Sequence, residues 1–349
     1  MAPVVLALRK QPWVRLRVLA TAQHREMLDQ VLDFFGIVPD IDFDVMRANQ
    51  RLAGLTARLL EKMDAVLEAE RPDVVLAQGD TTTVFATALA CFYQKVPFGH
   101  VEAGLRTGNM ANPFPEEMNR VVVGRMARWH FAPTERARQN LLAERTPEVH
   151  VHVTGNTVID ALEQVSARIP APERDPAEPR LILVTAHRRE NFGAPLESIL
   201  RALGTLADQR PDVHILYPVH PNPHVAPVVR RMLGDHPRIT LCEPLEYVPF
   251  VAAMKRSFLI LSDSGGVQEE APALAKPVLV LRNETERPEA IEAGVARLVG
   301  TDESNILAEV ARLLDDADAY RRMARGGSPY GDGHAAQRIV DVLRHDLVD

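Results

Sequence analysis

Short runs of apolar, mostly β-branched residues alternate with stretches of helical periodicity along the whole chain. The runs of the first half cover residues 16–21, 73–78, 96–101, 129–132 and 149–153. Those of the second half cover residues 181–185, 213–219, 239–242, 258–262, 278–281 and 296–299. Near-continuous apolar strands between helices are typical of parallel sheets covered on both faces. The pattern therefore predicts an α/β protein with two doubly wound domains and a ligand cleft between them, lined by the carboxyl ends of the strands.

Two segments depart from this regular alternation. Residues 169–179 are dense in proline and charge, which predicts a linker between the domains. Residues 2–10 have a helical pattern with Pro3 in the first turn, although a doubly wound domain normally opens on a strand. We therefore expect the first strand of the first domain to be missing. Asp40, Asp42 and Asp44 fall in a predicted loop before a helix and carry little weight.

Composition narrows the class of protein further. The 349 residues carry a net charge of −7, which argues against a nucleic acid or an anionic membrane as partner, while leaving room for a local basic pocket. The chain has no apolar run of the roughly 18 residues that a membrane helix needs, and its start lacks the charge order of a secretory signal. Cys91 and Cys242 lie in apolar segments and are expected to be buried thiols. These features predict a cytoplasmic protein.

The most informative segment is residues 261–270, where a predicted strand breaks at Ser264, Gly265 and Gly266 before a helix resumes. Backbone N–H groups and the dipole at such a helix start favour a phosphate group, and the glycines allow close approach. Glu270, one turn further on, is placed like the acid that binds ribose hydroxyls in nucleotide folds. An ordinary strand-to-helix turn remains the alternative for a Ser-Gly-Gly segment alone.

Three carboxylates follow predicted strands or loops of the first half: Asp80, Glu102 and Glu116. Each by itself fits a helix cap or a solvated helix start. Together, at one edge of one sheet, they favour proton transfer as their function.

Basic and aromatic side chains follow strands of the second half. The His187 loop could hold a diphosphate or could be a basic surface loop. Arg287 should lie beside the Ser264 turn if the two strands concerned are neighbours, and Phe250 fits base stacking or core packing. His220 and His224 are four residues apart, but the prolines between them exclude the helix that a zinc pair would need.

Taken together, the chain closely resembles the non-hydrolysing bacterial UDP-N-acetylglucosamine 2-epimerases. The matching segments, in the order of that family, are residues 21–30, 79–83, 99–108, 115–117, 154–160, 187–191, 263–271, 285–289 and 329–333. Their co-occurrence is far more specific than any one of them.

The resemblance implies two Rossmann-like domains of the glycosyltransferase B architecture and a homodimer. The first domain is expected over residues 1–168 and a UDP-binding domain over 180–333. The helix at 334–349 is expected to cross back to the first domain.

The implied reaction is reversible epimerisation between UDP-N-acetylglucosamine and UDP-N-acetylmannosamine, with no metal and no redox cofactor. UDP leaves, the carbon 2 proton is removed to give a 2-acetamidoglucal, and UDP returns after protonation on the other face. The resemblance assigns Asp80, Glu102 and Glu116 to proton transfer. It assigns substrate binding to eight further residues, His187, Phe250, Ser264, Gly265, Gly266, Glu270, Arg287 and Arg120. Gln23, Arg188 and His220 lie in segments that match a regulatory substrate site.

The chain departs from the family at its start, where family members carry a first strand and a Gly-Thr-Arg-Pro-Glu segment with a nearby lysine. Ala186 also stands where glycine is common. Three other functions remain open: a hydrolysing epimerase that releases N-acetylmannosamine, a glycosyltransferase, and a nucleotide-sugar binder without full catalysis. Retention of UDP in the product and turnover without an acceptor distinguish the first two from the epimerase.

Overall fold

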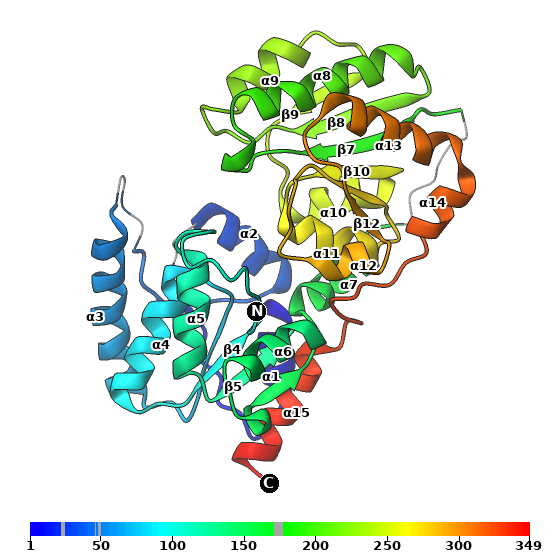
Figure 1. Cartoon of the computed structure of the whole chain (residues 1–349). Helices are drawn as coiled ribbons and strands as arrows, with labels where there is room; N and C mark the ends of the chain where they lie inside the picture. Colours follow the sequence, from blue (N-terminus) through cyan, green and yellow to red (C-terminus); the bar gives the residue numbers. More distant parts are fainter. Residues whose placement is uncertain (22–24, 46, 48–49, 171–176) are drawn as a thin grey trace. The chain divides into compact units, whose positions relative to one another are not determined.

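The computed structural model describes residues 1–21, 25–45, 47, 50–170 and 177–349 (Figure 1). Gln23 and much of the expected linker lie outside the described residues. The chain divides into two compact units: unit 1 comprises residues 1–161 and 330–349, and unit 2 comprises residues 162–329.

These boundaries fall a few residues before the positions suggested by the sequence, and hydrogen bonds account for the difference. Lys255 Nζ donates to the carbonyl oxygens of Ser166 and Ile169, at 2.8 Å each, and so ties to unit 2 one residue expected in the first domain and one expected in the linker. Asn156 N–H donates to the carbonyl oxygen of Tyr330 at 2.6 Å, which ties the buried Tyr330 to unit 1.

Unit 2 contains a six-stranded, fully parallel sheet in the order β12-β11-β10-β7-β8-β9. This is the nucleotide-binding order of a doubly wound sheet, which reverses between β7 and β10. Its elements are β7 (Arg180–Thr185), η2 (Arg189–Asn191), α8 (Ala194–Gln209), β8 (Val213–Pro218), α9 (Ala226–Leu233), β9 (Ile239–Cys242), α10 (Tyr247–Arg256), β10 (Leu259–Ser262), α11 (Gly265–Ala273), β11 (Val278–Val280), α12 (Pro288–Glu292), β12 (Ala296–Leu298), α13 (Glu303–Asp315) and α14 (Ala317–Met323).

Both faces of this sheet are buried. Ile182 and Val184 of β7 pack into the core formed with α8, α9, α13 and α14. Leu183, between them, is equally buried and points to the opposite face because side chains alternate along a strand. Figure 1 shows α10, α11 and α12 on that second face. The apolar run predicted for this strand is therefore explained by helices on both sides.

Within the described residues, unit 1 contains two separate parallel ladders, β1-β2 and β3-β4-β5-β6. Thr21, directly after β1, places its Oγ1 3.3 Å from Oγ1 of Thr83, which lies in the first turn of the helix that follows β3. The elements of the unit, with the helix that leads from it into unit 2, are α1 (Ala2–Arg9), β1 (Leu19–Ala20), α2 (Arg25–Phe35), β2 (Ile41–Asp42), α3 (Leu52–Glu70), β3 (Val75–Gln78), α4 (Thr82–Gln94), β4 (Phe98–Val101), α5 (Glu116–Met126), β5 (Trp129–Ala132), α6 (Glu135–Ala143), η1 (Glu148–His150), β6 (Val151–Val153), α7 (Thr157–Arg168) and α15 (Ala335–Leu347).

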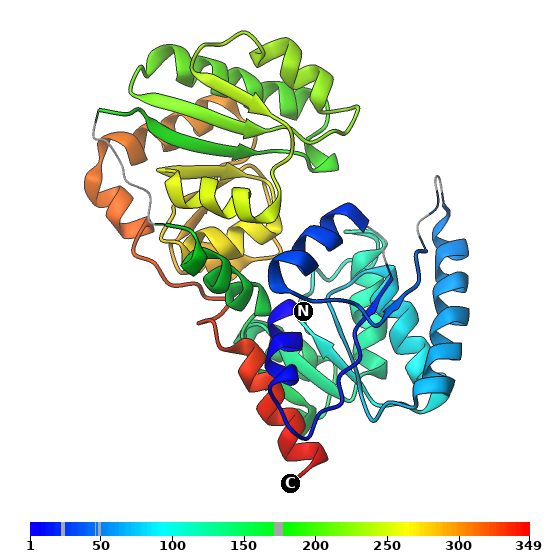
Figure 2. The ribbon, with the colours of Figure 1, turned by 180° about the vertical axis from the view of Figure 1, so that it is seen from behind.

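The first and last helices of the described chain pack against each other in unit 1 (Figure 2). Val4 and Leu8 of α1 share a core with Ile339 and Leu343 of α15. The indole N–H of Trp129 donates to Asp346 Oδ2 at 2.6 Å, which fixes α15 to β5. No described helix has the length and apolar character needed to cross a lipid bilayer.

Two buried histidines lie opposite each other on neighbouring strands of unit 1. His100 on β4 pairs in register with His130 on β5, and each residue is 1% exposed. His100 Nε2 lies 2.7 Å from the carbonyl oxygen of Gly79. Burial lowers the pKa of His100 to about 4 and that of His130 to about 3. Both imidazoles are therefore neutral in the folded protein at neutral pH.

Acid should destabilise unit 1 through these two side chains. The unfolded chain takes up protons below the ordinary imidazole pKa of 6.5, whereas folded His100 stays neutral down to about 4. The free energy of unfolding should fall as the pH is lowered from about 6.5 to about 4, by roughly 3 kcal/mol from His100 alone. Urea unfolding at a series of pH values measures this slope.

His100→Gln keeps a donor for the Gly79 carbonyl group but cannot titrate, so its pH slope should be shallower than that of the wild type. His345→Gln, at an exposed position of α15, serves as control and should leave the slope unchanged. Equal slopes for all three proteins would contradict this prediction.

Candidate functional site

The carboxyl end of β10 lies at the point where the strand order of unit 2 reverses. There Ser264 is the N-cap of α11, and its hydroxyl group makes no capping hydrogen bond within the described residues. The N–H groups at the start of α11 thus lack the usual side-chain acceptor. A Cβ atom on Gly265 would overlap the guanidinium group of Arg287, so the absence of a side chain lets this cation lie against the helix start. Uncapped N–H groups at a helix start, with a cation beside them, are expected of an anion-binding site.

Arg287 is held in place by two carboxylates. Its Nε lies 2.5 Å from Glu269 Oε1 and its Nη1 lies 2.5 Å from Glu286 Oε1. Burial opposes ionisation of Glu286, but Arg287 and Arg282 lower its pKa to about 2. The expectation that Arg287 stands beside the Ser264 turn is thus met, because β10 and β11 are neighbours.

Glu270, which is buried one turn into α11, is hydrogen-bonded to the half-buried Tyr247 at the start of α10. Tyr247 Oη donates to Glu270 Oε1 at 2.6 Å. Burial raises the pKa of Glu270 to about 7, although the Tyr247 hydrogen bond works in the opposite direction. Phe250 lies half-buried three residues after Tyr247, on the same side of α10. The phenol therefore occupies one carboxylate oxygen of Glu270, and the other lies 3.9 Å from where a Cβ of Gly266 would be.

The loop after β7 brings His187 to the same edge of the sheet. Its backbone N–H and that of Arg188 both donate to Asp263 Oδ2, at 2.8 Å each. The His187 ring stacks on His220, with centroids 5.2 Å apart and planes 12° apart. Arg188 Nη2 lies 4.0 Å from Glu286 Oε1. Two residues predicted for a regulatory site, Arg188 and His220, therefore lie directly beside His187.

His220 and His224, which the sequence excluded as a zinc pair, contact different rings. His220 stacks on His187, whereas His224 stacks on Phe192 with centroids 5.3 Å apart.

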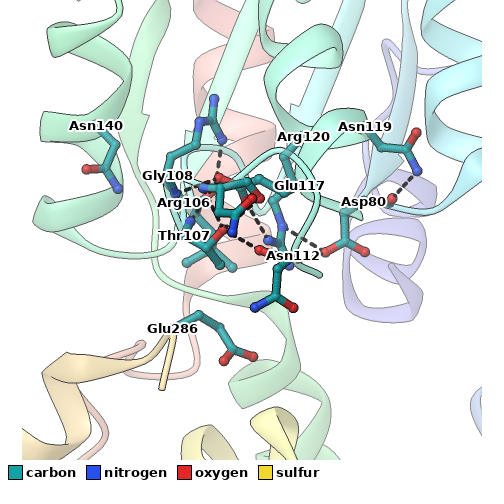
Figure 3. A network of polar contacts seen from close by, with 12 residues as sticks. Asp80, Arg106, Thr107, Gly108, Asn112, Glu117, Asn119, Arg120, Asn140 and Glu286 are labelled. Carbon is teal, nitrogen blue, oxygen red and sulfur yellow. Dashed lines mark hydrogen bonds and ion pairs between the residues drawn. The ribbon is translucent and has the colours of Figure 1, made fainter. Parts of the chain in front are cut away.

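In unit 1, Asp80 follows β3 and is part of a polar network (Figure 3). Arg120 of α5 directs Nε and Nη2 to Asp80 Oδ2, at 2.9 and 2.7 Å. Asn119 Nδ2 donates to the Asp80 carbonyl oxygen at 2.7 Å. Burial disfavours the Arg120 cation, but Asp80 and Glu117 raise its pKa above the usual value. Arg120 is thus occupied with Asp80 in this structure, and its predicted contact with substrate stays a prediction.

Glu117 is the most buried member of this network, with a side chain only 1% exposed. Its Oε1 accepts the N–H groups of Thr107 and Gly108 at 2.9 and 3.0 Å, and its Oε2 accepts Arg120 Nη1 at 2.8 Å. The sequence predicts a role in proton transfer for Glu116 but none for its neighbour Glu117. The three-residue spacing of Glu117 and Arg120 on one helix was the signal that could have shown their pairing.

The other two predicted carboxylates have different surroundings. Glu102 follows β4 with a φ of +64°, a left-handed conformation that is strained for glutamate and common at functional sites. Its Oε2 accepts Gln78 Nε2 at 3.0 Å. Glu116 is the half-buried first residue of α5, and its side chain makes no hydrogen bond or ion pair to any described residue. Since β3 and β4 are neighbours, Asp80 and Glu102 leave the sheet from adjacent strands.

Parallel sheets in both units, with an open helix start at the switch point of one, define a nucleotide-binding class of α/β protein. The family model for UDP-N-acetylglucosamine 2-epimerase matches residues 6–344. The chain belongs to the UDP-N-acetylglucosamine 2-epimerase family.

Individual relatives agree with this assignment over the full length. The UDP-N-acetylglucosamine 2-epimerase of Escherichia coli K12 is 51% identical, covering 100% of this chain and 96% of its own. That of Bacillus subtilis 168 is 50% identical, covering 98% and 91%. The crystal structure of the Neisseria meningitidis UDP-GlcNAc 2-epimerase bound to UDP-GlcNAc has a TM-score of 0.91 at 46% identity, covering 99% of this chain and 96% of its own. These similarities confirm the predicted fold class, an α/β protein of glycosyltransferase B type.

The Glu117 network should be a major source of stability in unit 1. Glu117→Gln places an amide NH₂ group opposite an N–H donor and leaves the buried Arg120 partly unpaired. We expect a loss of about 3 kcal/mol in the free energy of unfolding. Chemical unfolding measures this loss.

Glu144→Gln provides a matched control. Glu144 binds Arg106 through two hydrogen bonds of 2.7 and 3.0 Å, but its side chain is 26% exposed. Water can compensate there, so the loss should stay below about 1 kcal/mol. A cost for Glu144→Gln equal to that for Glu117→Gln would mean that burial does not set the value of the pair.

Proposed function

We propose that this protein is an isomerase that interconverts UDP-N-acetylglucosamine and UDP-N-acetylmannosamine without net hydrolysis. The observation that carries the proposal is the pair of strand ends that deliver Asp80 and Glu102 to one sheet edge, in a chain that is similar over its full length to named epimerases. The bound UDP-GlcNAc of the N. meningitidis relative supports the substrate. A homodimer stays a prediction.

The chemistry explains why such an enzyme needs both an anion site and carboxylates. The hydrogen on carbon 2 of the sugar is not acidified by a neighbouring carbonyl group, so direct deprotonation is too slow. Departure of UDP generates an oxocarbenium-like centre at carbon 1, which acidifies that hydrogen. Removal of the proton leaves 2-acetamidoglucal and UDP. Protonation of carbon 2 on the opposite face, with return of UDP to carbon 1, gives the epimer.

We assign the departing diphosphate to unit 2. The N–H groups of Gly265 and Gly266 at the start of α11, the hydroxyl group of Ser264 and the cation of Arg287 would stabilise its negative charge, whereas the Ser264 N–H already donates to Ser262 Oγ at 3.0 Å. His187 would donate a hydrogen bond to it. Glu270 would accept hydrogen bonds from the ribose hydroxyl groups through the carboxylate oxygen that Tyr247 does not use. Tyr247 and Phe250 would together shape the nucleoside pocket.

We assign proton transfer to the carboxylates of unit 1. Two faces of carbon 2 require two groups in different positions, and Asp80, Glu102 and Glu116 are the candidates. Arg120 fixes one oxygen of Asp80, which leaves the other available as proton acceptor. Glu116, without a partner among the described residues, is free to take a different role from the tightly held Asp80.

The proposed reaction should introduce solvent hydrogen at carbon 2. UDP-N-acetylglucosamine incubated with the enzyme in deuterated water should gain deuterium there and reach a mixture with its manno epimer. Proton NMR follows both changes in one sample. Epimer without deuterium, or free N-acetylmannosamine as the main product, would refute elimination and re-addition.

Amide variants should separate catalysis from nucleotide binding. Asp80→Asn, Glu102→Gln and Glu116→Gln keep the side-chain shape but cannot accept a proton, so turnover should fall by about 100-fold or more. The Kd for UDP, measured by calorimetry, should stay near that of the wild type. Glu135→Gln, an exposed carboxylate of α6, is the control. Wild-type turnover in all three variants would remove the carboxylates from the mechanism.

A further inference from the structure

Asp263 is a fully buried carboxylate at the switch point of unit 2, with an exposure of 0%. Its Oδ2 accepts three N–H groups, from the backbone of His187 and Arg188 at 2.8 Å and from Asn191 Nδ2 at 3.0 Å. This oxygen clamps the loop after β7 to the end of β10. The clamp accounts for one of the two carboxylate oxygens.

The other oxygen, Oδ1, is buried and has no hydrogen-bond partner within the described residues. A buried charged oxygen without a donor costs free energy and requires an explanation. His187 Nδ1 lies 3.6 Å away, just beyond hydrogen-bond distance. The nearby buried hydroxyl of Tyr217 is not the missing donor, because it donates to the Ala186 carbonyl oxygen at 2.9 Å. The geometry therefore leaves a place for one N–H donor, and the imidazole of His187 stands next to it.

Charged and titratable groups around His187 shift its pKa in opposite directions. Burial lowers its pKa, Asp263 raises it, and His220 and Arg188 lower it. His220 stacks on the His187 ring, and its own Nδ1 accepts Asn222 N–H at 3.1 Å. The free protein thus holds His187 without an added proton at neutral pH, beside a carboxylate oxygen that could stabilise one.

The anion site lies on the neighbouring strand. Ser262 of β10 pairs in register with Thr185 of β7, so Ser264 and His187 each stand two residues past this pair on adjacent strands. Adjacent strands are roughly 5 Å apart, which brings the imidazole within reach of an anion at the start of α11. A diphosphate there would add the negative charge that favours the imidazolium form.

Resting on the proposed function for its ligand, we propose that Asp263 is a positioning residue that makes His187 take up a proton when a diphosphate binds. The imidazolium then donates Nδ1–H to Asp263 Oδ1 and Nε2–H to the diphosphate. The proton comes from solvent, and no covalent bond changes. When the bond from carbon 1 to the diphosphate breaks, the charge that grows on the leaving group meets a cation already in place.

Calorimetric titration with UDP tests the proton uptake without requiring turnover. Binding is measured near pH 7.5 in buffers of different ionisation enthalpy, and the slope of the observed enthalpy against ionisation enthalpy gives the protons taken up. The wild type should take up more than His187→Gln, by a fraction of a proton approaching about one. Asp263→Asn should resemble His187→Gln, because its NH₂ group would replace the acceptor that the Nδ1–H needs.

Asp160→Asn is a matched control in unit 1. Asp160 is 3% exposed and accepts the backbone N–H groups of Ala335 and Ala336 at 3.2 and 2.8 Å, but it has no role in the proposed reaction. Its proton uptake should equal that of the wild type. Thermal melts of all variants report whether each is folded. If Asp263→Asn is unstable, the proton uptake of His187→Gln, which keeps the backbone hydrogen bonds to Oδ2, tests the proposal by itself.

Equal proton uptake in the wild type and in His187→Gln would overturn the proposal, as would uptake in folded Asp263→Asn equal to that of the wild type. In the deuterium exchange assay, Asp263→Asn should lower kcat by about 10- to 100-fold with a smaller change in KM. A wild type that takes up the proton but fails to exchange carbon 2 would refute the epimerase function alone. A wild type that exchanges but takes up no proton would refute only the proposed action of Asp263 on His187.

Discussion

The parallel pairing of β7 with β10 is the interaction on which the binding side of the molecule depends. The Asp263 N–H donates to the Thr185 carbonyl oxygen at 3.1 Å, and the hydroxyl groups of Thr185 and Ser262 lie 2.7 Å apart. These contacts place an acidic residue at the end of one strand against the loop that follows the other. Because the strand order reverses here, helices leave in opposite directions and open the sheet edge to a ligand. The strand order therefore determines where the anion site lies, and the side chains at that edge add its charge.

Unit 1 shows the opposite way of handling buried charge. Glu117, Arg120 and Asp80 satisfy one another and the loop at residues 107–108, so nearly every polar atom of the network has a partner. Such a network is rigid, and it presents one Asp80 oxygen in a defined direction. In unit 2, Oδ1 of Asp263 has no hydrogen-bond partner in the part of the chain that the structure describes. Unit 1 thus pairs its buried charges with one another, whereas the Asp263 carboxylate of unit 2 is held by N–H groups through one oxygen only.

The sequence was sufficient to predict every strand of the two larger sheets, because strands buried on both faces are mostly apolar. The sequence does not predict β2 (Ile41–Asp42), because a two-residue strand among aspartates carries no periodic signal. In the site, neighbouring strands made the meeting of Arg287 with the helix start predictable. The Asp263 clamp and the Tyr247–Glu270 pair were not predicted, since they join residues 76 and 23 positions apart and depend on side-chain directions. Sequence motifs identify the segments that form the candidate site, but only the three-dimensional structure shows which carboxylate oxygen of Asp263 or Glu270 accepts each hydrogen bond.

The division of the chain also has a consequence for its synthesis on the ribosome. Unit 2 is a single continuous segment, whereas unit 1 is completed by residues 330–349. Ile339 and Leu343 of α15 fill the core beside Val4, and Asp346 provides the acceptor for the indole of Trp129. Until these last residues emerge, unit 1 exposes the apolar surface that α15 later covers, while all of unit 2 is already available to fold. The core of unit 1, whose synthesis begins first, therefore cannot be completed until unit 2 has been synthesised.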